Sequence, residues 1–437
     1  MAEVLDLDSF TDEDKEYLQD TLVCDGADIF EIYDTKIHLP FSFARSTIDE
    51  IHRRLIVPTE NIQFTGKLRE DQLAVYEYII DKLNTTGGAI VSARPGFGKT
   101  ITAISIASKL KVKTLIVVNK LILIDQWIAG INTFSSARVS VVKPTDDNLV
   151  TDSNFYIVNA INIGKKTPCF WKDVKLLIVD ELHQIITKKL IGYLLRICPD
   201  AVLGLSATPY RHDEYHKAIS WVFGDNVIGA ELNQAHTYRI VHTKYVPKNV
   251  QYGFKGLDWS KILEDQASNE TRNKCIVKEC LAEISNSKTV LILVKRVYHA
   301  DILVDMIRRE NPEIKVSTLV RSERTFDKDC KVLIGTTSKI GVGFDHAPIN
   351  CLIVAADIKN YFIQFLGRCM RNPDVIPSVV DFKDDFNILR NHLTIRIKEY
   401  EKHGGKEICT DENIDDTRDK ACTSNKLCNS KWFRRVR

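Results

Sequence analysis

The fold class of the chain is indicated most clearly by GGAIVSARPGFGKTITAISIASKL, residues 87–110. It runs from an apolar segment through a loop with two glycines, Ala93–Thr100, into a segment with apolar residues at helical spacing. Backbone N–H groups of such a loop point inward, and the positive end of the following helix reinforces them, so that together they bind phosphate oxygens. The stretch therefore predicts a strand, a phosphate-binding loop and a helix, which belong to an α/β domain.

Short apolar runs continue along the chain, separated by segments with helical patterns. Uninterrupted runs of this kind are typical of parallel strands that are buried on both faces. They fall into two groups, so we expect an α/β fold with two parallel sheets. The first group comprises residues 87–93, 113–118, 154–160, 175–180 and 201–208, and the second comprises 289–294, 315–320, 331–337, 351–357 and 378–382.

The length of 437 residues also favours two domains, because one hydrophobic core rarely organises a chain of this size. We expect an amino-terminal extension over residues 1–60, a first domain over 61–228, a second domain over 229–402 and a polar tail over 403–437. Within the extension, YDTKIHLPFSFA (33–44) predicts a strand followed by a turn at Pro40.

The composition excludes several classes of protein. Hydrophobic residues make up 44% and charged residues 27%, and no run approaches the roughly 18 apolar residues of a membrane span. The acidic start lacks the features of a secretion signal, so we expect an intracellular, reducing compartment and unpaired thiols for most of the eleven cysteines. An alternative for His403, Cys409, Cys422 and Cys428 is a zinc site, although their spacing fits no common pattern.

The loop residues suit a nucleoside triphosphate with magnesium, so ATP and Mg²⁺ are the expected cofactors. Lys99 would reach the β and γ phosphates, and the Thr100 hydroxyl would bind the metal. The alternative is a chance glycine turn before a helix. The expected nucleotide-binding loop comprises Ala93, Arg94, Pro95, Gly96, Phe97, Gly98, Lys99 and Thr100.

Two acidic residues follow an apolar run in LLIVDELH, residues 176–183. They emerge at the carboxyl end of a predicted strand, where α/β sheets place their ligands. Asp180 would hold the magnesium ion, and Glu181 would orient and deprotonate the attacking water. Without the phosphate loop, an acidic pair that caps the next helix would be the better interpretation.

With these motifs the chain resembles a superfamily 2 helicase or translocase of the D-E-x-H type. LSATPYR (205–211) resembles the S-A-T segment of that family, and QFLGRCMR (364–371) resembles its Q-x-x-G-R-x-x-R segment. The spacing of Gln364, Arg368 and Arg371 predicts one helical face that presents all three, while Gly367 permits close approach. The resemblance implies that the two arginines act as arginine fingers on the γ-phosphate.

Looser matches complete the family pattern. Arg69 and Gln72 in FTGKLREDQ resemble the segment that reads adenine, and VVNKLILIDQW resembles P-T-x-x-L-x-x-Q-W with Asn119 and Lys120 in place of Pro-Thr. In GTTSKIGVGFD (335–345), the resemblance implies a phosphate contact for Thr337 and nucleotide sensing for Gly343 and Asp345. Nucleic-acid contact and coupling are the implied roles of Gln126, Trp127, His183, Ser206, Thr208 and Thr337.

The resemblance implies two tandem RecA-like domains and an ATP-dependent helicase or translocase. It is strongest to the branch with the XPB subunit of TFIIH, the phage UvsW recombination helicase and the poxvirus transcript-release helicase, and the leader resembles those of large DNA viruses. We expect a monomer that moves 3′ to 5′ on nucleic acid, DNA rather than RNA, in transcription or replication, within host cytoplasm, nucleus or virion. Because the net charge is only +2, binding would use a local groove along the sugar-phosphate backbone.

Four alternatives to this interpretation stay open. Two of them retain ATP-driven movement along nucleic acid: a translocase without strand separation, and an RNA helicase. The third is a small-molecule kinase with the same phosphate loop, which leaves the second domain without a role. The fourth is an inactive helicase-like scaffold, against which the intact Lys99, Asp180, Glu181 and Arg371 argue.

Overall fold

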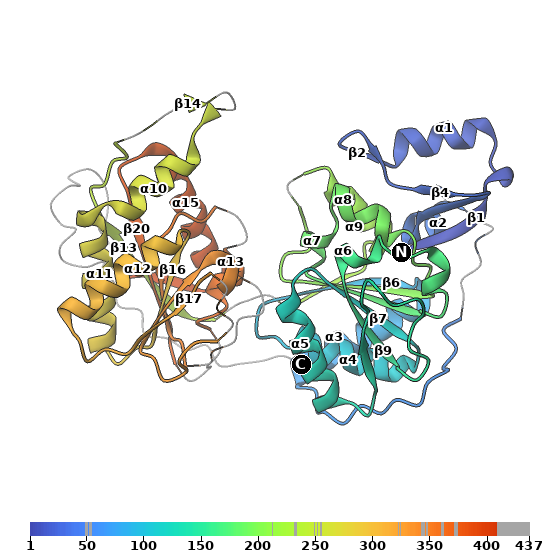
Figure 1. Cartoon of the computed structure of the whole chain (residues 1–437), viewed down its shortest axis with the longest axis horizontal. Coiled ribbons are helices and arrows are strands. Elements are labelled where there is room, and N and C mark those ends of the chain that lie inside the picture. The colour runs from blue at the N-terminus through green and yellow to red at the C-terminus, as the bar shows by residue number, and fades with distance from the viewer. Residues whose placement is uncertain are drawn as a thin grey trace, which may run out of the picture.

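The computed structural model describes residues 1–48, 51, 55–211, 213–230, 234–248, 250, 252–253, 256–321, 323, 325–341, 346, 348–359, 362–370 and 375–408. Two α/β units lie side by side, each built on a parallel sheet of seven strands (Figure 1). All ten predicted apolar runs are strands of these sheets, so the predicted fold class is confirmed. Strands such as TLIVV (114–118) are buried at every residue because helices cover both faces of the sheet.

The first sheet has the order β12-β6-β11-β10-β7-β9-β8. The strands are β12 (Val227–Ala230), β6 (Gly88–Ala93), β11 (Ala201–Ser206), β10 (Leu176–Asp180), β7 (Thr114–Val118), β9 (Phe155–Asn159) and β8 (Val139–Val141). One face packs on α3 (Glu70–Thr85), α4 (Lys99–Leu110) and α5 (Leu121–Phe134). The other packs on α6 (Ala160–Ile163), α7 (Leu182–Ile185), α8 (Lys188–Leu194) and α9 (Tyr215–Phe223).

The second sheet has the order β17-β18-β16-β19-β20-β13-β21. The strands are β17 (Val316–Leu319), β18 (Val332–Thr336), β16 (Val290–Val294), β19 (Cys351–Val354), β20 (Ser378–Lys383), β13 (His236–His242) and β21 (Gly405–Glu407). One face packs on α11 (Glu270–Ser285) and α12 (Val297–Glu310), and the other on α13 (Thr337–Ile340), α14 (Ile363–Leu366) and α15 (Asn387–Lys402). Because β21 belongs to this sheet, the sheet continues past residue 402, where the sequence places the end of the domain.

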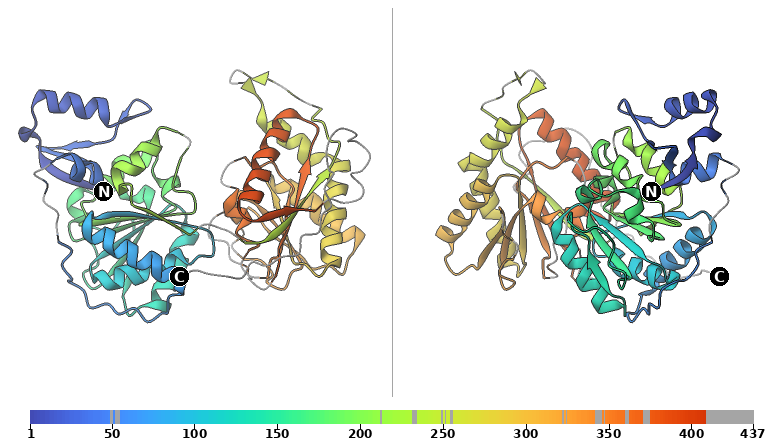
Figure 2. Two further views of the ribbon diagram at one scale, coloured as in Figure 1. Left: turned by 180° about the vertical axis from the view of Figure 1, so that it is seen from behind. Right: turned by 45° about the vertical axis from the view of Figure 1, so that its right-hand side comes forward.

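The amino-terminal extension is folded onto the first unit. Strands β1 (Ala2–Asp6), β5 (Lys36–Pro40) and β4 (Glu31–Tyr33) form an antiparallel sheet beside α1 (Asp12–Thr21), α2 (Phe41–Thr47) and the short hairpin of β2 (Val23–Cys24) and β3 (Ala27–Asp28). Its apolar side chains share a core with α8 and α9, and it lies apart from the second unit in each view (Figure 2). The predicted turn at Pro40 is wrong: helix α2 begins at Phe41, directly after the strand.

One further helix, a short hairpin and two 3₁₀ turns are also present in the described chain. The second unit also contains α10 (Trp259–Ser268) and a two-stranded hairpin of β14 (Tyr252–Gly253) and β15 (Gly256–Leu257). Two 3₁₀ turns lie over Leu7–Ser9 and Pro168–Trp171. Within the part of the chain that the structure describes, no helix combines the length and the apolarity needed to cross a membrane.

Candidate active site

The loop between β6 and α4 has the backbone geometry of a phosphate cradle. Gly96 and Gly98 adopt φ values of 81° and 90°, a region that favours glycine. A Cβ atom on Gly98 would lie 2.4 Å from Nε2 of Gln72, so a larger residue would displace that amide. Lys99 follows at the first position of α4, and its Nζ donates a hydrogen bond to the carbonyl of Ala93 at 2.9 Å. The Lys99 side chain therefore crosses the loop in which a phosphate chain would bind.

Gln72 supports this loop from behind. Its side chain is 1% exposed, its Nε2 donates to the Phe97 carbonyl at 2.7 Å, and its Oε1 accepts from the Arg69 backbone N–H at 2.9 Å. Nη2 of Arg69 donates to the same Phe97 carbonyl at 2.6 Å. Both residues, predicted to read adenine, thus hold the loop, and Arg69 also lines the cavity described below.

The two carboxylates of the DELH segment lie at the end of β10, beside the loop. Asp180 is 7% exposed, and its Oδ1 accepts the Glu181 backbone N–H at 3.0 Å. Burial, followed by the charge of Glu181, raises the pKa of Asp180 from 3.8 to about 6. A buried carboxylate with a raised pKa next to a second carboxylate favours a bound cation in place of a proton. The Thr100 hydroxyl lines the same cavity, so the oxygen donors present suit magnesium.

Trp127 makes a hydrogen bond to the DELH segment that its predicted role in nucleic-acid contact and coupling does not include. Its indole is 1% exposed, so the ring does not present a face to nucleic acid, and its Nε1 donates to Oδ2 of Asp180 at 2.9 Å. The side chain packs in the core beside Leu123 and Ile131, at spacings of four residues along α5. Sequence reasoning missed this hydrogen bond, although the buried stripe on α5 was a signal that Trp127 points into the domain. Its neighbour Gln126 lines the nucleotide cavity.

His183 lies at the centre of a polar cluster behind Glu181. Nδ1 of His183 is 2.8 Å from Oγ of Ser206, and that oxygen also accepts the Thr208 backbone N–H at 3.0 Å. Burial lowers the pKa of His183 to about 4, so the imidazole is neutral at physiological pH. With the proton on Nδ1, its Nε2 accepts from the amides of Gln184 at 3.2 Å and Gln364 at 3.4 Å. The S-A-T segment and the second unit therefore meet at the histidine of the DELH segment.

The second unit closes the cavity through residues 364–370. A Cβ atom on Gly367 would lie 3.1 Å from Cδ of Pro95, so a glycine at this position permits close approach to the phosphate loop. Arg368 donates from Nη2 to the Gly341 carbonyl at 3.0 Å. Burial lowers the pKa of Arg368 to about 10, while the charge of Glu181 opposes the shift. The arginine therefore lies within electrostatic range of the candidate catalytic carboxylate on the other unit.

The predicted helix across residues 364–371 is wrong in its length. Helix α14 ends at Leu366, and Arg368 and Cys369 donate their N–H groups three residues back, to Phe365 and Leu366. Arg368 therefore lies in the tighter turns that follow α14, and it still lines the same cavity as Gln364. Arg371, Gly343 and Asp345 lie outside the described residues, as do Cys409, Cys422 and Cys428 of the alternative zinc site. Thr337 is the first residue of α13, and its phosphate contact stays a prediction.

A cavity of about 900 Å³ lies between the two units. Lys99, Asp180 and Glu181 line it, and so does Phe134, an aromatic side chain that sequence reasoning missed. A cavity of this size accommodates a nucleotide. The lining residues are Arg69, Arg94, Pro95, Gly96, Gly98, Lys99, Thr100, Leu123, Gln126, Trp127, Ala129, Gly130, Phe134, Asp180 and Glu181 from the first unit, with Gln234, Gln364, Arg368 and Met370 from the other side.

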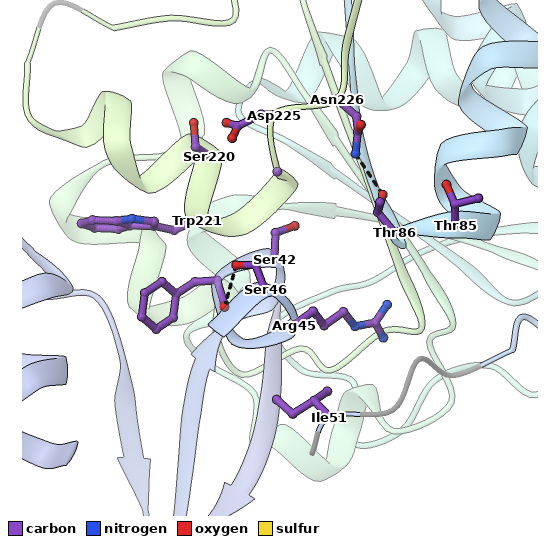
Figure 3. Close-up of a pocket in the computed structure, with 12 residues that line it drawn as sticks. Ser42, Arg45, Ser46, Ile51, Thr85, Thr86, Ser220, Trp221, Asp225 and Asn226 are labelled. Atoms are coloured by element: carbon purple, nitrogen blue, oxygen red, sulfur yellow. Dashed lines mark hydrogen bonds between the residues drawn. The ribbon is translucent and has the colours of Figure 1, made fainter. Parts of the chain in front are cut away.

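A second cavity, of about 530 Å³, lies where the extension meets the first unit (Figure 3). Three of its polar side chains make hydrogen bonds within the protein: Ser42 donates to the Val222 carbonyl, Nε of Arg45 donates to Oε1 of Glu3, and Asn226 donates to Oγ1 of Thr86. We assign no function to it.

Comparisons with known proteins agree with this geometry. Residues 65–211 match the family model described as type III restriction enzyme, res subunit. The chain is 39% identical over 393 residues to "Putative helicase 161L" of Invertebrate iridescent virus 6, across 84% of this chain and 88% of the relative. It is 30% identical over 336 residues to "Putative helicase 055L" of Frog virus 3, across 74% and 75%.

Among solved structures, the chain is similar to one titled "S. cerevisiae Dbp5 bound to RNA and ADP BeF3". The TM-score is 0.53 at 15% identity, and the match covers 80% of this chain and 90% of that one. This likeness supports the fold of two tandem RecA-like domains. From the identity to its viral relatives and the order of its motifs, the chain belongs to the superfamily 2 helicases, which hydrolyse ATP.

Proposed function

We propose that this protein couples ATP hydrolysis in the cavity between its two domains to movement along nucleic acid and to strand separation. The observation that carries the proposal is the composition of that cavity, because Lys99, Asp180 and Glu181 come from the first domain whereas Gln364 and Arg368 come from the second. A site completed by two bodies is sensitive to their relative position, so the nucleotide state would move one domain against the other.

Each side chain has a defined role in the proposed reaction. Lys99 would leave the Ala93 carbonyl and bind the β and γ phosphates, and Arg368 would stabilise charge on the transferred phosphoryl group. Glu181 would orient the attacking water and accept its proton. Thr100 and Asp180 would hold Mg²⁺, which supplies neutralising charge on the phosphates. Phe134 and Arg69 would contact the base and sugar, since both line the cavity.

His183 is the proposed coupling residue. It contacts Ser206 of the S-A-T segment on one side and Gln364 of the second domain on the other. A change in the position of either domain would therefore alter the hydrogen bonds beside Glu181.

The proposed substrate is DNA, held through its sugar-phosphate backbone, with 3′ to 5′ movement in viral transcription or replication. The resemblance to the XPB and UvsW branch supports DNA, and the viral relatives support a virus-encoded role inside a host cell. We propose residues 1–60 as an extension and 61–228 and 229–402 as the two motor domains, with β12 and β21 extending the first and the second domain past these bounds.

The test is a panel of nucleic acids. ATP turnover of the full chain is measured with single-stranded DNA, duplex DNA, forked DNA and RNA, alongside separation of the forked duplex. We expect single-stranded or forked DNA to stimulate turnover most, with separation of the fork. Stimulation by RNA alone would replace the proposal by an RNA helicase. Stimulation by DNA without separation would leave a translocase, and no stimulation by any nucleic acid would refute the proposed function.

A further inference from the structure

Asn119 and Lys120 occupy the two positions where the chain departs from the Pro-Thr pair of the family pattern. They connect the carboxyl end of β7 to the start of α5. Strand β7 pairs with β10 in parallel, with Val117 beside Val179, so this connection lies next to the DELH segment. Both side chains make hydrogen bonds that the family pattern does not predict.

Asn119 is hydrogen-bonded to Gln184, the residue that follows the DELH segment. Its Nδ2 donates to Oε1 of Gln184 at 2.5 Å. The amide of Gln184 in turn contacts Nε2 of His183, the atom that Gln364 of the second domain also approaches. A contiguous set of polar contacts therefore runs from the end of β7 to the second domain.

Lys120 makes a direct contact across the interface. Its Nζ donates to the Ser338 carbonyl of α13 at 3.1 Å. The charged groups that face the ammonium are Glu181, which attracts it, and Lys339 and Arg368, which repel it, and burial lowers the pKa of Lys120. The ammonium thus lies among the groups of the catalytic interface, and its contact on the second domain is within the helix that begins with Thr337.

We infer that Asn119 and Lys120 form a linkage between the two domains, in which Lys120 is a positioning residue that holds α13 beside the DELH segment. The inference rests on the proposed function in one respect: α13 begins with the residue predicted to contact the nucleic-acid backbone, so the linkage would connect that contact to the site of hydrolysis. It differs from the simplest alternative, in which the ammonium binds a nucleic-acid phosphate directly.

The two interpretations predict different measurements on the full chain. The variants are Lys120→Met, which keeps length but loses the donor, Lys120→Arg, which keeps a cationic donor, and Lys109→Met, which removes one charge from the exposed end of α4 as a control. Turnover at saturating ATP is measured without nucleic acid and with saturating single-stranded DNA. The salt dependence of DNA affinity is measured in parallel.

We expect Lys120→Met to lower kcat on the order of tenfold with and without DNA, the effect of one lost charge-assisted hydrogen bond. The KM for ATP and the slope of log Kd against log salt should be unchanged. Lys120→Arg should restore most of the rate, and Lys109→Met should match the unaltered chain.

The inference is overturned if Lys120→Met keeps its basal kcat while the salt slope falls by about 0.7, the change expected for one lost phosphate contact on a single strand. An unchanged kcat with an unchanged slope also overturns it. If nucleic acid does not stimulate the unaltered chain, the proposed function is refuted. The Lys120 inference can still be tested in that case, because basal turnover is measured without nucleic acid.

Discussion

Replacing Trp127 with phenylalanine removes the indole N–H that donates to Oδ2 of Asp180 at 2.9 Å. A hydrogen bond to a charged group contributes about 1.5–3 kcal/mol, which corresponds to about 1–2 pKa units. The bond stabilises the ionised carboxylate, so its loss raises the pKa of Asp180 from about 6 to roughly 7–8. At pH 7 the ionised fraction would then fall from about nine-tenths to half or less.

The assay is kcat/KM for ATP from pH 5.5 to 9 at fixed free Mg²⁺, since this ratio reports ionisations of the free enzyme. We expect the acid limb of Trp127→Phe to move up by about 1–2 units, with most activity recovered at pH 9. Ile131→Val is the matched control, because Ile131 is also fully buried on α5 and its truncation leaves the indole bond intact. An acid limb with an unchanged midpoint would refute the assigned role of the Trp127 bond.

Three further predictions concern the same site. Asp180→Asn should inactivate the enzyme and remove a pH-dependent cost, because burial raises the folded-state pKa of Asp180 from 3.8 to about 6, so that ionisation costs the unaltered chain roughly 3 kcal/mol above pH 6 and nothing below about pH 4. The Asn amide loses one of the two hydrogen bonds from Glu181 and Trp127 at every pH, so the test is the pH dependence of the difference between the two chains. The free energy of unfolding of the variant minus that of the unaltered chain should rise by roughly 3 kcal/mol from about pH 4 to about pH 7, as measured by thermal unfolding without nucleotide. A difference that stays constant over this range would contradict the prediction. Glu181→Gln should bind ATP with little change in affinity and lose at least 10²-fold in kcat, as judged by equilibrium binding and single-turnover hydrolysis; near-normal turnover would exclude Glu181 as the base. Gly367→Val should lower kcat, because a side chain at this position meets Pro95 of the phosphate loop. Gly229→Ala is the control that should be tolerated, because a Cβ atom there would have its nearest contact at 3.4 Å. Equal kcat for both variants would show that close approach at Gly367 is unnecessary.

Much of the fold could be predicted from the sequence because its strands are buried on both faces. Segments such as LLIVD (176–180) and VLILV (290–294) carry an uninterrupted apolar pattern that few other elements share. The attachment of the extension could not be predicted this way. Phe41 and Leu39 pack in a core with Phe223, and no local pattern records which distant segment covers an apolar side chain.

The candidate site, like the fold, could be predicted from the sequence only in part. The glycines and Lys99 are specified by local backbone geometry, so their motif predicts their place in the loop. The partners of Trp127, Gln72 and Lys120 depend on which strands are neighbours in the sheet and on how the domains meet. The early end of α14 follows from the tight turns after Leu366, although the residue spacing alone favours a longer helix.

In the proposed mechanism, the second domain supplies a side chain to the reaction in the first. Arg368→Ala in the full chain tests it most directly, with ATP affinity measured by equilibrium binding and hydrolysis by single turnover. The hydrolysis rate should fall on the order of 10³-fold, with ATP affinity changed by less than about tenfold. A hydrolysis rate within a few-fold of the unaltered chain would contradict it.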